Sequence, residues 1–219
     1  MPKLSTVELT FQTPGGVSPP WYPTGFAPGV IPLSDGTVLH LPMGFMQNGA
    51  VSGIDLLPGP PYYDATSDAS YVDWAAVPSG LFTRTSFLIQ STTNKDAYFQ
   101  VDDTTLTCRY YWDGEVVVAS FPYDPVNMRF WRLRHDGVHV HWEIASVLGA
   151  WSQVAVESIL DWSSWTTVGA VTVSVAHVNI AGALVGEAQL RGFNATTPFG
   201  FGHDPMLDLI LASVRRTFP

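Results

Sequence analysis

The sequence predicts an all-β fold, a sandwich or barrel built from many short antiparallel strands. Apolar and polar residues alternate through Thr104–Trp112 and again through Phe130–His135, which is the period of a strand with one face on the core. Each run is followed by an Asp-Gly pair, Asp113-Gly114 and Asp136-Gly137, and we expect a tight type I′ hairpin at the first of them. Turn signals recur about every 8–12 residues, which is typical of a sandwich or barrel.

Prolines are dense in the first sixty or so residues and divide this segment into short extended pieces. We expect strands at Val7–Phe11 and Thr37–Leu41, the second introduced by a Ser34-Asp35-Gly36 turn. The aromatic residues from Trp21 to Phe26 are expected in the loop between these two strands.

The strands are better defined from about residue 70 onward, where the alternation is regular and few prolines intervene. The phase of the alternation places four tryptophans in the core: Trp112, Trp131, Trp142 and Trp151. The expected strands are Leu81–Gln90, Ala97–Val101, Thr104–Trp112, Glu115–Phe121, Phe130–His135, Val138–Ser146, Trp151–Val156 and Val168–Val178.

Length, charge and cysteine content narrow the class of protein. With 219 residues, 46% of them hydrophobic and 13% charged, the chain can bury the core of one domain. The net charge of −9 argues against nucleic acid and against an anionic membrane surface as partners. Cys108 is the only cysteine, which excludes an intrachain disulfide and a multi-cysteine zinc site. We expect neither a membrane helix nor a secretory signal peptide.

The run Phe130–Glu143, with the sequence FWRLRHDGVHVHWE, carries a family resemblance. It resembles the W-R-(I/L)-R-x-D-G segment of concanavalin-A-like lectin and glucanase domains, in the version found in minor tail proteins of actinobacterial phages. The likeness continues to Trp151 and loosely covers residues 30–195, although the Asp-Gly that the family places shortly before this tryptophan is absent. The resemblance implies a two-sheet antiparallel jelly-roll sandwich over residues 1–197, of which residues 1–60 are a proline-rich entry.

Residues 198–219 would then form a C-terminal tail available for docking. In this tail, an Asp204-Pro205 pair precedes apolar residues with helical spacing between Leu207 and Val214, which favours a short amphipathic helix. A last strand around Leu209–Leu211 remains the alternative.

His139, His141 and Glu143 project from one face of a strand, because side chains alternate with period two. A His-x-His pair on a strand can present two imidazoles to zinc. The competing interpretation is a polar face on which Arg132 and Arg134 of the neighbouring strand pair with Glu143. We favour the second interpretation and predict no metal and no other cofactor, keeping the first three residues as the alternative metal site.

Glycoside hydrolysis requires two carboxyl groups about 5–10 Å apart on either side of the sugar bond. The resemblance implies that catalytic members of this fold carry them on one strand, as Glu-x-Asp-x-x-Glu or a close variant. This chain has no such run: Glu143, Glu157 and Glu187 are isolated, and Asp102-Asp103 has the character of a turn. The sequence therefore predicts a protein without catalytic residues.

Aromatic side chains outside the core phase are the candidates for carbohydrate binding, because aromatic rings stack on sugar faces. The candidate carbohydrate-binding residues are Trp21, Tyr22, Tyr62, Tyr63, Tyr111, Trp162 and Trp165.

These observations favour a non-catalytic structural component of a phage virion, a minor tail protein that presents a lectin-like domain to host surface glycan. The expected partners are other virion tail proteins, further copies of the chain in a homo-oligomer, and host cell-wall glycan. The expected location is the phage tail. Two alternatives remain open: a carbohydrate-active enzyme or its accessory carbohydrate-binding module, and a purely architectural or capsid-decorating sandwich.

Overall fold

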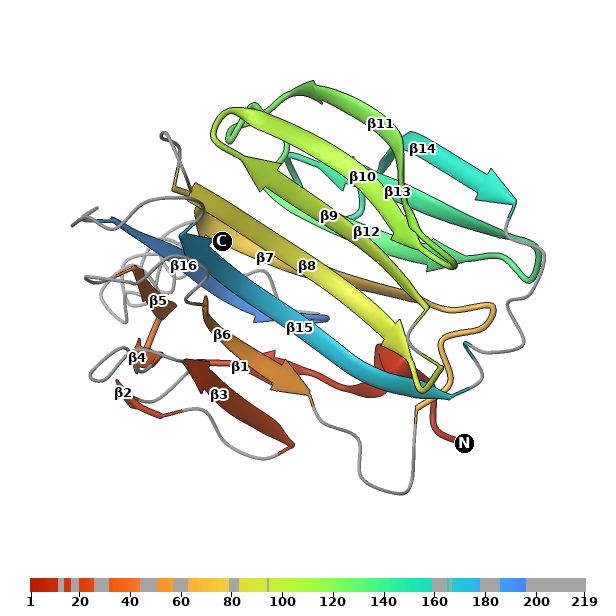
Figure 1. Ribbon diagram of the computed structural model, residues 1–219. Coiled ribbons are helices and arrows are strands. Elements are labelled where there is room, and N and C mark those ends of the chain that lie inside the picture. Colours follow the sequence, from red (N-terminus) through yellow and green to blue (C-terminus); the bar gives the residue numbers. More distant parts are fainter. Residues whose placement is uncertain are drawn as a thin grey trace, which may run out of the picture.

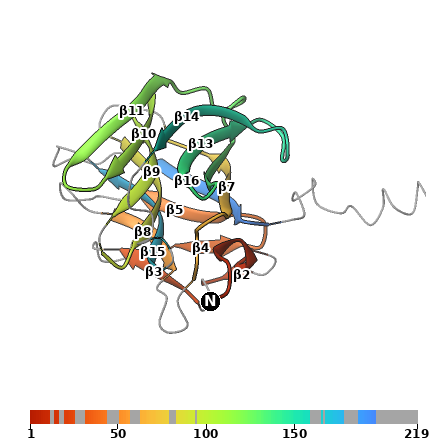
Figure 2. The ribbon, with the colours of Figure 1, turned by 90° about the vertical axis from the view of Figure 1, so that its right-hand side faces the viewer.

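Two antiparallel β-sheets packed face to face form the described part of the molecule (Figure 1). The computed structural model describes residues 1–11, 14–16, 20–25, 32–43, 51–56, 63–78, 83–93, 95–158, 165, 167–177 and 186–195. In these ranges a single turn of 3-10 helix, η1 (Leu4–Thr6), accompanies the strands, and no helix is long and apolar enough to cross a membrane. The side view separates the two sheets as two layers (Figure 2), and the predicted two-sheet jelly-roll sandwich is confirmed.

The first sheet has nine strands in the order β14-β13-β12-β7-β16-β5-β4-β2, with β1 also paired to β16. Strand β16 lies in the middle of this sheet, between β7 and β5. It comes late in the chain, whereas both of its neighbours come much earlier. The strands are β1 (Leu9–Thr10), β2 (Pro14–Gly15), β4 (Leu33–Asp35), β5 (Leu39–Met43), β7 (Ala69–Ala76), β12 (Phe130–His135), β13 (His139–Ala145), β14 (Ser152–Ser158) and β16 (Gly186–Phe193).

The second sheet has seven strands in the order β11-β10-β9-β8-β15-β6-β3. Its central strands are long and fully paired on both sides, whereas β11 and β3 form its edges. The strands are β3 (Trp21–Gly25), β6 (Val51–Leu56), β8 (Thr83–Ser91), β9 (Asp96–Asp102), β10 (Thr105–Tyr111), β11 (Glu115–Pro122) and β15 (Val168–His177).

The core lies between the two sheets and is rich in aromatic rings. Trp131 of β12 is fully buried there, with its ring centroid 5.2 Å from that of Trp74, 5.8 Å from Phe99 and 6.0 Å from Tyr123. Such tilted and edge-on pairs add to the stabilisation that burial of the rings provides. The core positions predicted for Trp131 and Trp142 are confirmed.

The strands predicted after residue 70 are all present with shifted ends, and β12 has the predicted bounds. The loop predicted around Trp21 is wrong, because Trp21 opens strand β3 and packs on Phe193 across the core. Pro23 is tolerated in this strand since β3 lies at the sheet edge, where one row of backbone donors has no partner strand among the described residues. The prediction for Phe26 and the helix or strand predicted in residues 198–219 lie outside the described residues.

The two Asp-Gly hairpins both have three residues between their strands. In the β10–β11 connection neither Asp113 nor Gly114 has a positive φ, so the predicted type I′ turn is wrong. In the β12–β13 connection Gly137 has a φ of 102°, which favours glycine, and the Asp136 N–H donates to the His139 carbonyl at 3.1 Å.

Trp151, which the alternation placed in the core, lies on the outer face of the nine-stranded sheet instead. The Arg132 guanidinium stands 4.1 Å above its ring centre, and the rings of Phe130 and Tyr71 flank it. The register shift between β13 and β14 pairs Trp142 with Ala155 but Glu143 with Gln153, so Gln153 lies on the outer face. Trp151, two positions before Gln153, lies on the same outer face.

Asn194 joins the end of β16 to the N-terminal segment and to β7. The side chain is buried, and its Nδ2 lies within hydrogen-bond distance of the carbonyls of Leu4 (3.2 Å) and Val7 (3.1 Å) and of Ser70 Oγ (3.3 Å). Its Oδ1 accepts from the Tyr71 N–H at 2.8 Å. The residue has a φ of 49°, a conformation that asparagine adopts more readily than most residues.

Candidate functional site

The outer face of the seven-stranded sheet carries a group of polar side chains on its β9 strand. Ala97, Phe99 and Val101 point into the core and are fully buried. Because successive side chains alternate between the two faces, the intervening residues lie on the outer face. These are Asp96, Tyr98, Gln100 and Asp102.

One row across three strands places a carboxyl group on either side of a tyrosine. Tyr111 of β10 pairs with Asp96 of β9 on one side and with Glu115 of β11 on the other. Directly paired residues share a face, and neighbouring strands are about 4.8 Å apart, so the Cα atoms of Asp96 and Glu115 lie roughly 10 Å apart. Tyr111 is 44% exposed between them.

Glu115 belongs to a hydrogen-bonded network that extends along the same face. The Tyr98 hydroxyl donates to Glu115 Oε1, and Arg109 Nη1 donates to the same oxygen at 2.9 Å. The other terminal nitrogen of Arg109 is 3.5 Å from Asp102 Oδ2, and Arg84 Nε donates to Asp102 Oδ1 at 2.8 Å. Glu115 and Asp102 are therefore fixed by cationic partners.

The two carboxyl groups of the row have pKa values shifted in opposite directions. Burial raises the pKa of Asp96, and a hydrogen bond with Gln90 only partly offsets the shift. Asp96 Oδ1 is buried and has no hydrogen-bond partner among the described residues. The hydrogen bond from Tyr98 lowers the pKa of Glu115, and Arg109 lowers it further. The row thus combines a carboxyl group that holds its proton more tightly with one stabilised as an anion, which suits a general acid and a base.

Asp55 of β6 is a third acidic residue on the outer face with a perturbed carboxyl group. Burial raises the pKa of Asp55, against the opposing effect of a hydrogen bond with Thr172. Strand β6 is three strands away from β9, which is roughly 14 Å. This separation is too large for Asp55 to flank the same sugar bond as Asp96.

The predicted carbohydrate-binding aromatics do not form one surface. Tyr22 and Tyr111 are exposed on the outer face of the seven-stranded sheet, but β3 and β10 are five strands apart, roughly 24 Å. Tyr63 is partly buried against the core, and its backbone forms an isolated bridge with Val168.

Two of these aromatics are in the core, which corrects the prediction that they are free for ligand. Trp21 and Trp165 are both almost fully buried, Trp21 against Phe193 and Trp165 beside the His135 ring. A side chain enclosed between the sheets cannot stack on a sugar. The predictions for Tyr62 and Trp162 lie outside the described residues.

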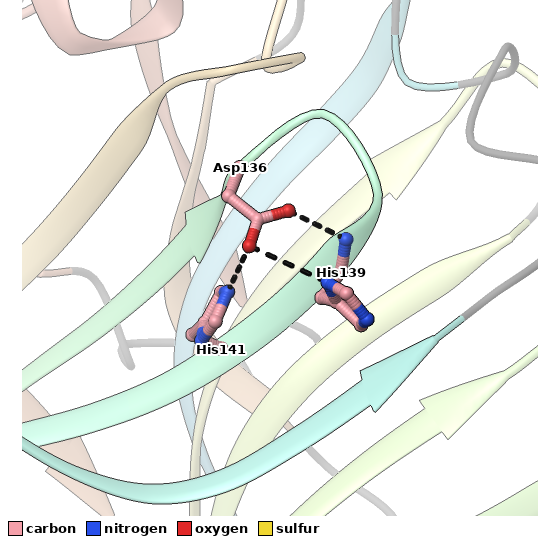
Figure 3. A group of neighbouring side chains, drawn as sticks. All are labelled: Asp136, His139 and His141. Atoms are coloured by element: carbon pink, nitrogen blue, oxygen red, sulfur yellow. Dashed lines mark hydrogen bonds and ion pairs between the residues drawn. The ribbon is translucent and has the colours of Figure 1, made fainter.

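A second cluster of polar side chains lies on the outer face of the nine-stranded sheet. His139 and His141 point from β13 toward Asp136 in the preceding turn (Figure 3). Asp136 Oδ2 is 2.7 Å from His141 Nε2 and 3.4 Å from His139 Nδ1. Backbone and side-chain hydrogen bonds, with the His139 N–H contributing most, lower the pKa of Asp136.

Glu143, the third residue of the alternative metal site, is engaged elsewhere. Arg132 Nε donates to its Oε2 at 2.5 Å and Arg134 Nε to its Oε1 at 3.0 Å. The predicted cross-strand pairing of these residues is confirmed. The carboxylate that faces the two histidines is that of Asp136, which the sequence pattern placed only in a turn.

Asp96, Asp102 and Glu115 were not among the site residues predicted from the sequence. The expected catalytic motif lies along one strand, whereas Asp96 and Glu115 meet across three strands. The predicted two-residue hairpin at Asp113-Gly114 would pair Trp112 with Glu115, whereas the observed three-residue connection pairs Tyr111 with Glu115. The register of β9 against β10 has no signal in the sequence.

Comparison with solved structures finds the same fold in several carbohydrate-active enzymes. A non-specific endo-β-1,3(4)-glucanase of family GH16, SCLam, superposes with a TM-score of 0.65 at 8% identity, over 86% of this chain and 88% of the glucanase. The ligand-free Crh5 transglycosylase gives 0.58 at 16% identity, over 86% and 82%. A laminarinase from Flavobacterium sp. UMI-01 gives 0.55 at 9% identity, over 86% and 97%. No protein-family model and no curated protein sequence matches the chain.

These likenesses show a concanavalin-A-like jelly roll of the kind found in glucanases and transglycosylases. They contradict the predicted non-catalytic role in a phage tail and the predicted absence of enzymatic activity, since the solved structures named above are enzymes acting on carbohydrate. They support the alternative of a carbohydrate-active protein. The expected virion location, tail-protein partners and homo-oligomer stay predictions.

Proposed function

We propose that this chain is a carbohydrate-active enzyme that binds a polysaccharide across the outer face of the seven-stranded sheet and acts on its glycosidic bonds. The observation that carries the proposal is the row of Asp96, Tyr111 and Glu115, in which two carboxyl groups with oppositely shifted pKa values flank an exposed aromatic ring. The likeness in fold to an endo-β-1,3(4)-glucanase and a laminarinase favours a β-glucan as substrate.

In this proposal Asp96 is the general acid. Its raised pKa keeps the carboxyl group protonated to higher pH, so that it can donate a proton to the leaving glycosidic oxygen. Tyr111 supports the sugar ring by stacking, and its exposed position between the two carboxyl groups places the scissile bond over the row.

Glu115 is the anionic partner, either as base for a water molecule or as nucleophile. Its contacts with Arg109 and Tyr98 hold it ionised and fix its direction. The Cα spacing of roughly 10 Å across two strand intervals is compatible with carboxyl groups about 5–10 Å apart.

The test is release of reducing ends from laminarin and from a mixed-linkage β-1,3(4)-glucan. We expect Asp96→Asn and Glu115→Gln each to lower turnover by about a hundredfold or more, because each removes a proton-transfer or charge-stabilising group. Glu157→Gln on β14, in the other sheet, is the matched control and should leave turnover unchanged. Unchanged turnover in both Asp96→Asn and Glu115→Gln would refute the assignment.

A second candidate is an accessory carbohydrate-binding module that holds polysaccharide without cleaving it. The arginine contacts of Asp102 and Glu115 favour this candidate, because salt-bridged carboxylates often serve structure instead of chemistry. Binding to insoluble β-glucan that is lost in Tyr111→Ala, with no product from any substrate in the panel, would establish the module and exclude the enzyme.

A further inference from the structure

We propose that Asp136, His139 and His141 form a binding site for a divalent transition-metal ion, with Zn²⁺ as the best-fitting ion. One ligand atom from each residue lies within 4.8 Å of the other two (Figure 3). The site belongs to the nine-stranded sheet, so it is separate from the row of carboxyl groups proposed for carbohydrate.

The Asp136 carboxylate is already oriented for an ion. Its Oδ1 accepts the backbone N–H groups of Val138 (2.9 Å) and His139 (2.8 Å), which ties the carboxylate to the turn. Its Oδ2 is thereby directed at the two imidazoles. Gly137, with its φ of 102°, gives the turn the conformation that brings Asp136 back over β13.

His141 is oriented from the other side by Gln153 of β14. The Nδ1 atom of His141 lies 2.6 Å from Gln153 Oε1, within hydrogen-bond distance of the side-chain amide. Metal-bound histidines typically have such a partner on the second ring nitrogen, which fixes the tautomer and the ring plane. The remaining nitrogen, Nε2, is left to face Asp136.

Two imidazole nitrogens converge on one carboxylate oxygen. His141 Nε2 lies 2.7 Å and His139 Nδ1 3.4 Å from Asp136 Oδ2. A metal ion bound at this oxygen would have both nitrogens as further ligands.

The donor set and the spacing suit zinc. Two imidazoles and one carboxylate are ligands that zinc accepts, at about 2.0–2.2 Å, whereas calcium and magnesium prefer oxygen alone. Tetrahedral ligands at that radius are roughly 3.4 Å apart, which matches the 3.4 Å between Asp136 Oδ2 and His139 Nδ1. The 2.7 Å between Asp136 Oδ2 and His141 Nε2 is shorter and would lengthen on binding.

Exposure gives the ion a path and leaves room for a fourth ligand. The side chains of His139 and Asp136 are 41% and 34% exposed, and that of His141 is 11% exposed. Three protein ligands with one open side are the arrangement in which zinc keeps a water molecule. The neighbouring Arg134 does not compete for the site, because its Nε donates to Glu143.

The test uses the full chain without a histidine tag, titrated calorimetrically with ZnCl₂ and monitored by visible absorption with CoCl₂. We expect one ion per chain and a tetrahedral Co²⁺ spectrum. His139→Ala, the least intrusive variant because the side chain is exposed, should weaken Zn²⁺ binding by about tenfold or more, and Gln153→Ala by about ten- to a hundredfold. His40→Ala, which removes a histidine that also contacts two carboxylates, is the matched control and should bind as the unaltered chain does.

Thermal unfolding supplies a second readout. Zn²⁺ at about a hundred times its Kd should raise the Tm of the unaltered chain by about 5–10 °C, and the same concentration should raise that of His139→Ala by at most about half as much. Binding of less than one ion in ten chains at millimolar Zn²⁺, or equal affinity in His139→Ala, would overturn the proposal. Equal affinity for Mg²⁺ would overturn it as well, since imidazole ligands disfavour that ion.

Discussion

Replacing Asn194 by alanine should lower the free energy of unfolding of the sandwich, mainly through the loss of buried hydrogen bonds. The side chain offers two donor hydrogens to the Leu4 and Val7 carbonyls and to Ser70 Oγ, and one acceptor to the Tyr71 N–H. Each buried hydrogen bond contributes about 1 kcal/mol, and buried groups left without partners cost more. We therefore expect Asn194→Ala to lower the free energy of unfolding by about 3–4 kcal/mol.

For a chain of this length, a loss of that size corresponds to a Tm lowered by about 6–15 °C. Differential scanning calorimetry or urea titration followed by tryptophan fluorescence measures it. Asn194→Gly separates the loss of the side-chain hydrogen bonds from backbone strain, because glycine adopts the positive φ without strain but forms none of these bonds. Asn194→Asp keeps the shape and loses the donors, so it should destabilise at least as much as alanine at neutral pH.

The matched control is Asn127→Ala, which removes an exposed asparagine whose Nδ2 donates to Asp124 at 2.6 Å. That bond is open to water, so its loss should change the free energy of unfolding by less than about 0.5 kcal/mol. If Asn194→Ala is no less stable than Asn127→Ala, the buried asparagine does not join the N-terminal segment to the sheet as described.

Other perturbations test the packing and electrostatics of the described residues. The hydrogen bond with Asp35 raises the pKa of His40 above 6.5. Protonated His40 therefore stabilises the fold below about pH 6.5, and this stabilisation is lost as the pH rises through the raised pKa. Between about pH 6 and 8 the Tm of the unaltered chain should fall more steeply than that of His40→Gln. Burial raises the pKa of the Cys108 thiol, so a disulfide reagent should label Cys108 only at the rate of global opening and rapidly in denaturant. Gly53→Ala should destabilise the fold by about 1–3 kcal/mol, because a Cβ there would lie 2.6 Å from a backbone carbonyl oxygen, whereas Gly114→Ala, with open space around it, should not.

Alternation predicted the strands from β8 to β15. Strands β7 and β16 were not predicted, although Trp74 and Leu190 face the core. The strand at Phe130–His135 was predicted with its correct bounds, because Trp131 and Leu133 face the core while the arginines between and after them face outward. Trp21 was misplaced because the prolines around it argue against a central strand, and only the sheet order shows that β3 is an edge strand, which tolerates proline.

The candidate sites depended on contacts that a single strand does not encode. Period-two alternation grouped His139 and His141 with Glu143, because all three share a face. Arg132 and Arg134 of the neighbouring strand form ion pairs with Glu143. The carboxylate that faces the two histidines is that of Asp136, which the turn holds in position. Asp96 and Glu115 are 19 positions apart in the chain and become neighbours of Tyr111 only through the register of two strand pairs.

The central position of β16 in the nine-stranded sheet has a consequence for how the chain folds. Until Gly186–Phe193 has been synthesised, β5 and β7 each lack a neighbour, and their unpaired backbone edges are open to other chains. Closure must bring together segments separated by more than a hundred residues, which slows folding relative to a meander of the same size. Aggregation during synthesis should therefore depend on how quickly this one strand inserts, and substitutions in β16 should reduce the yield of folded protein more than equally destabilising ones in β10.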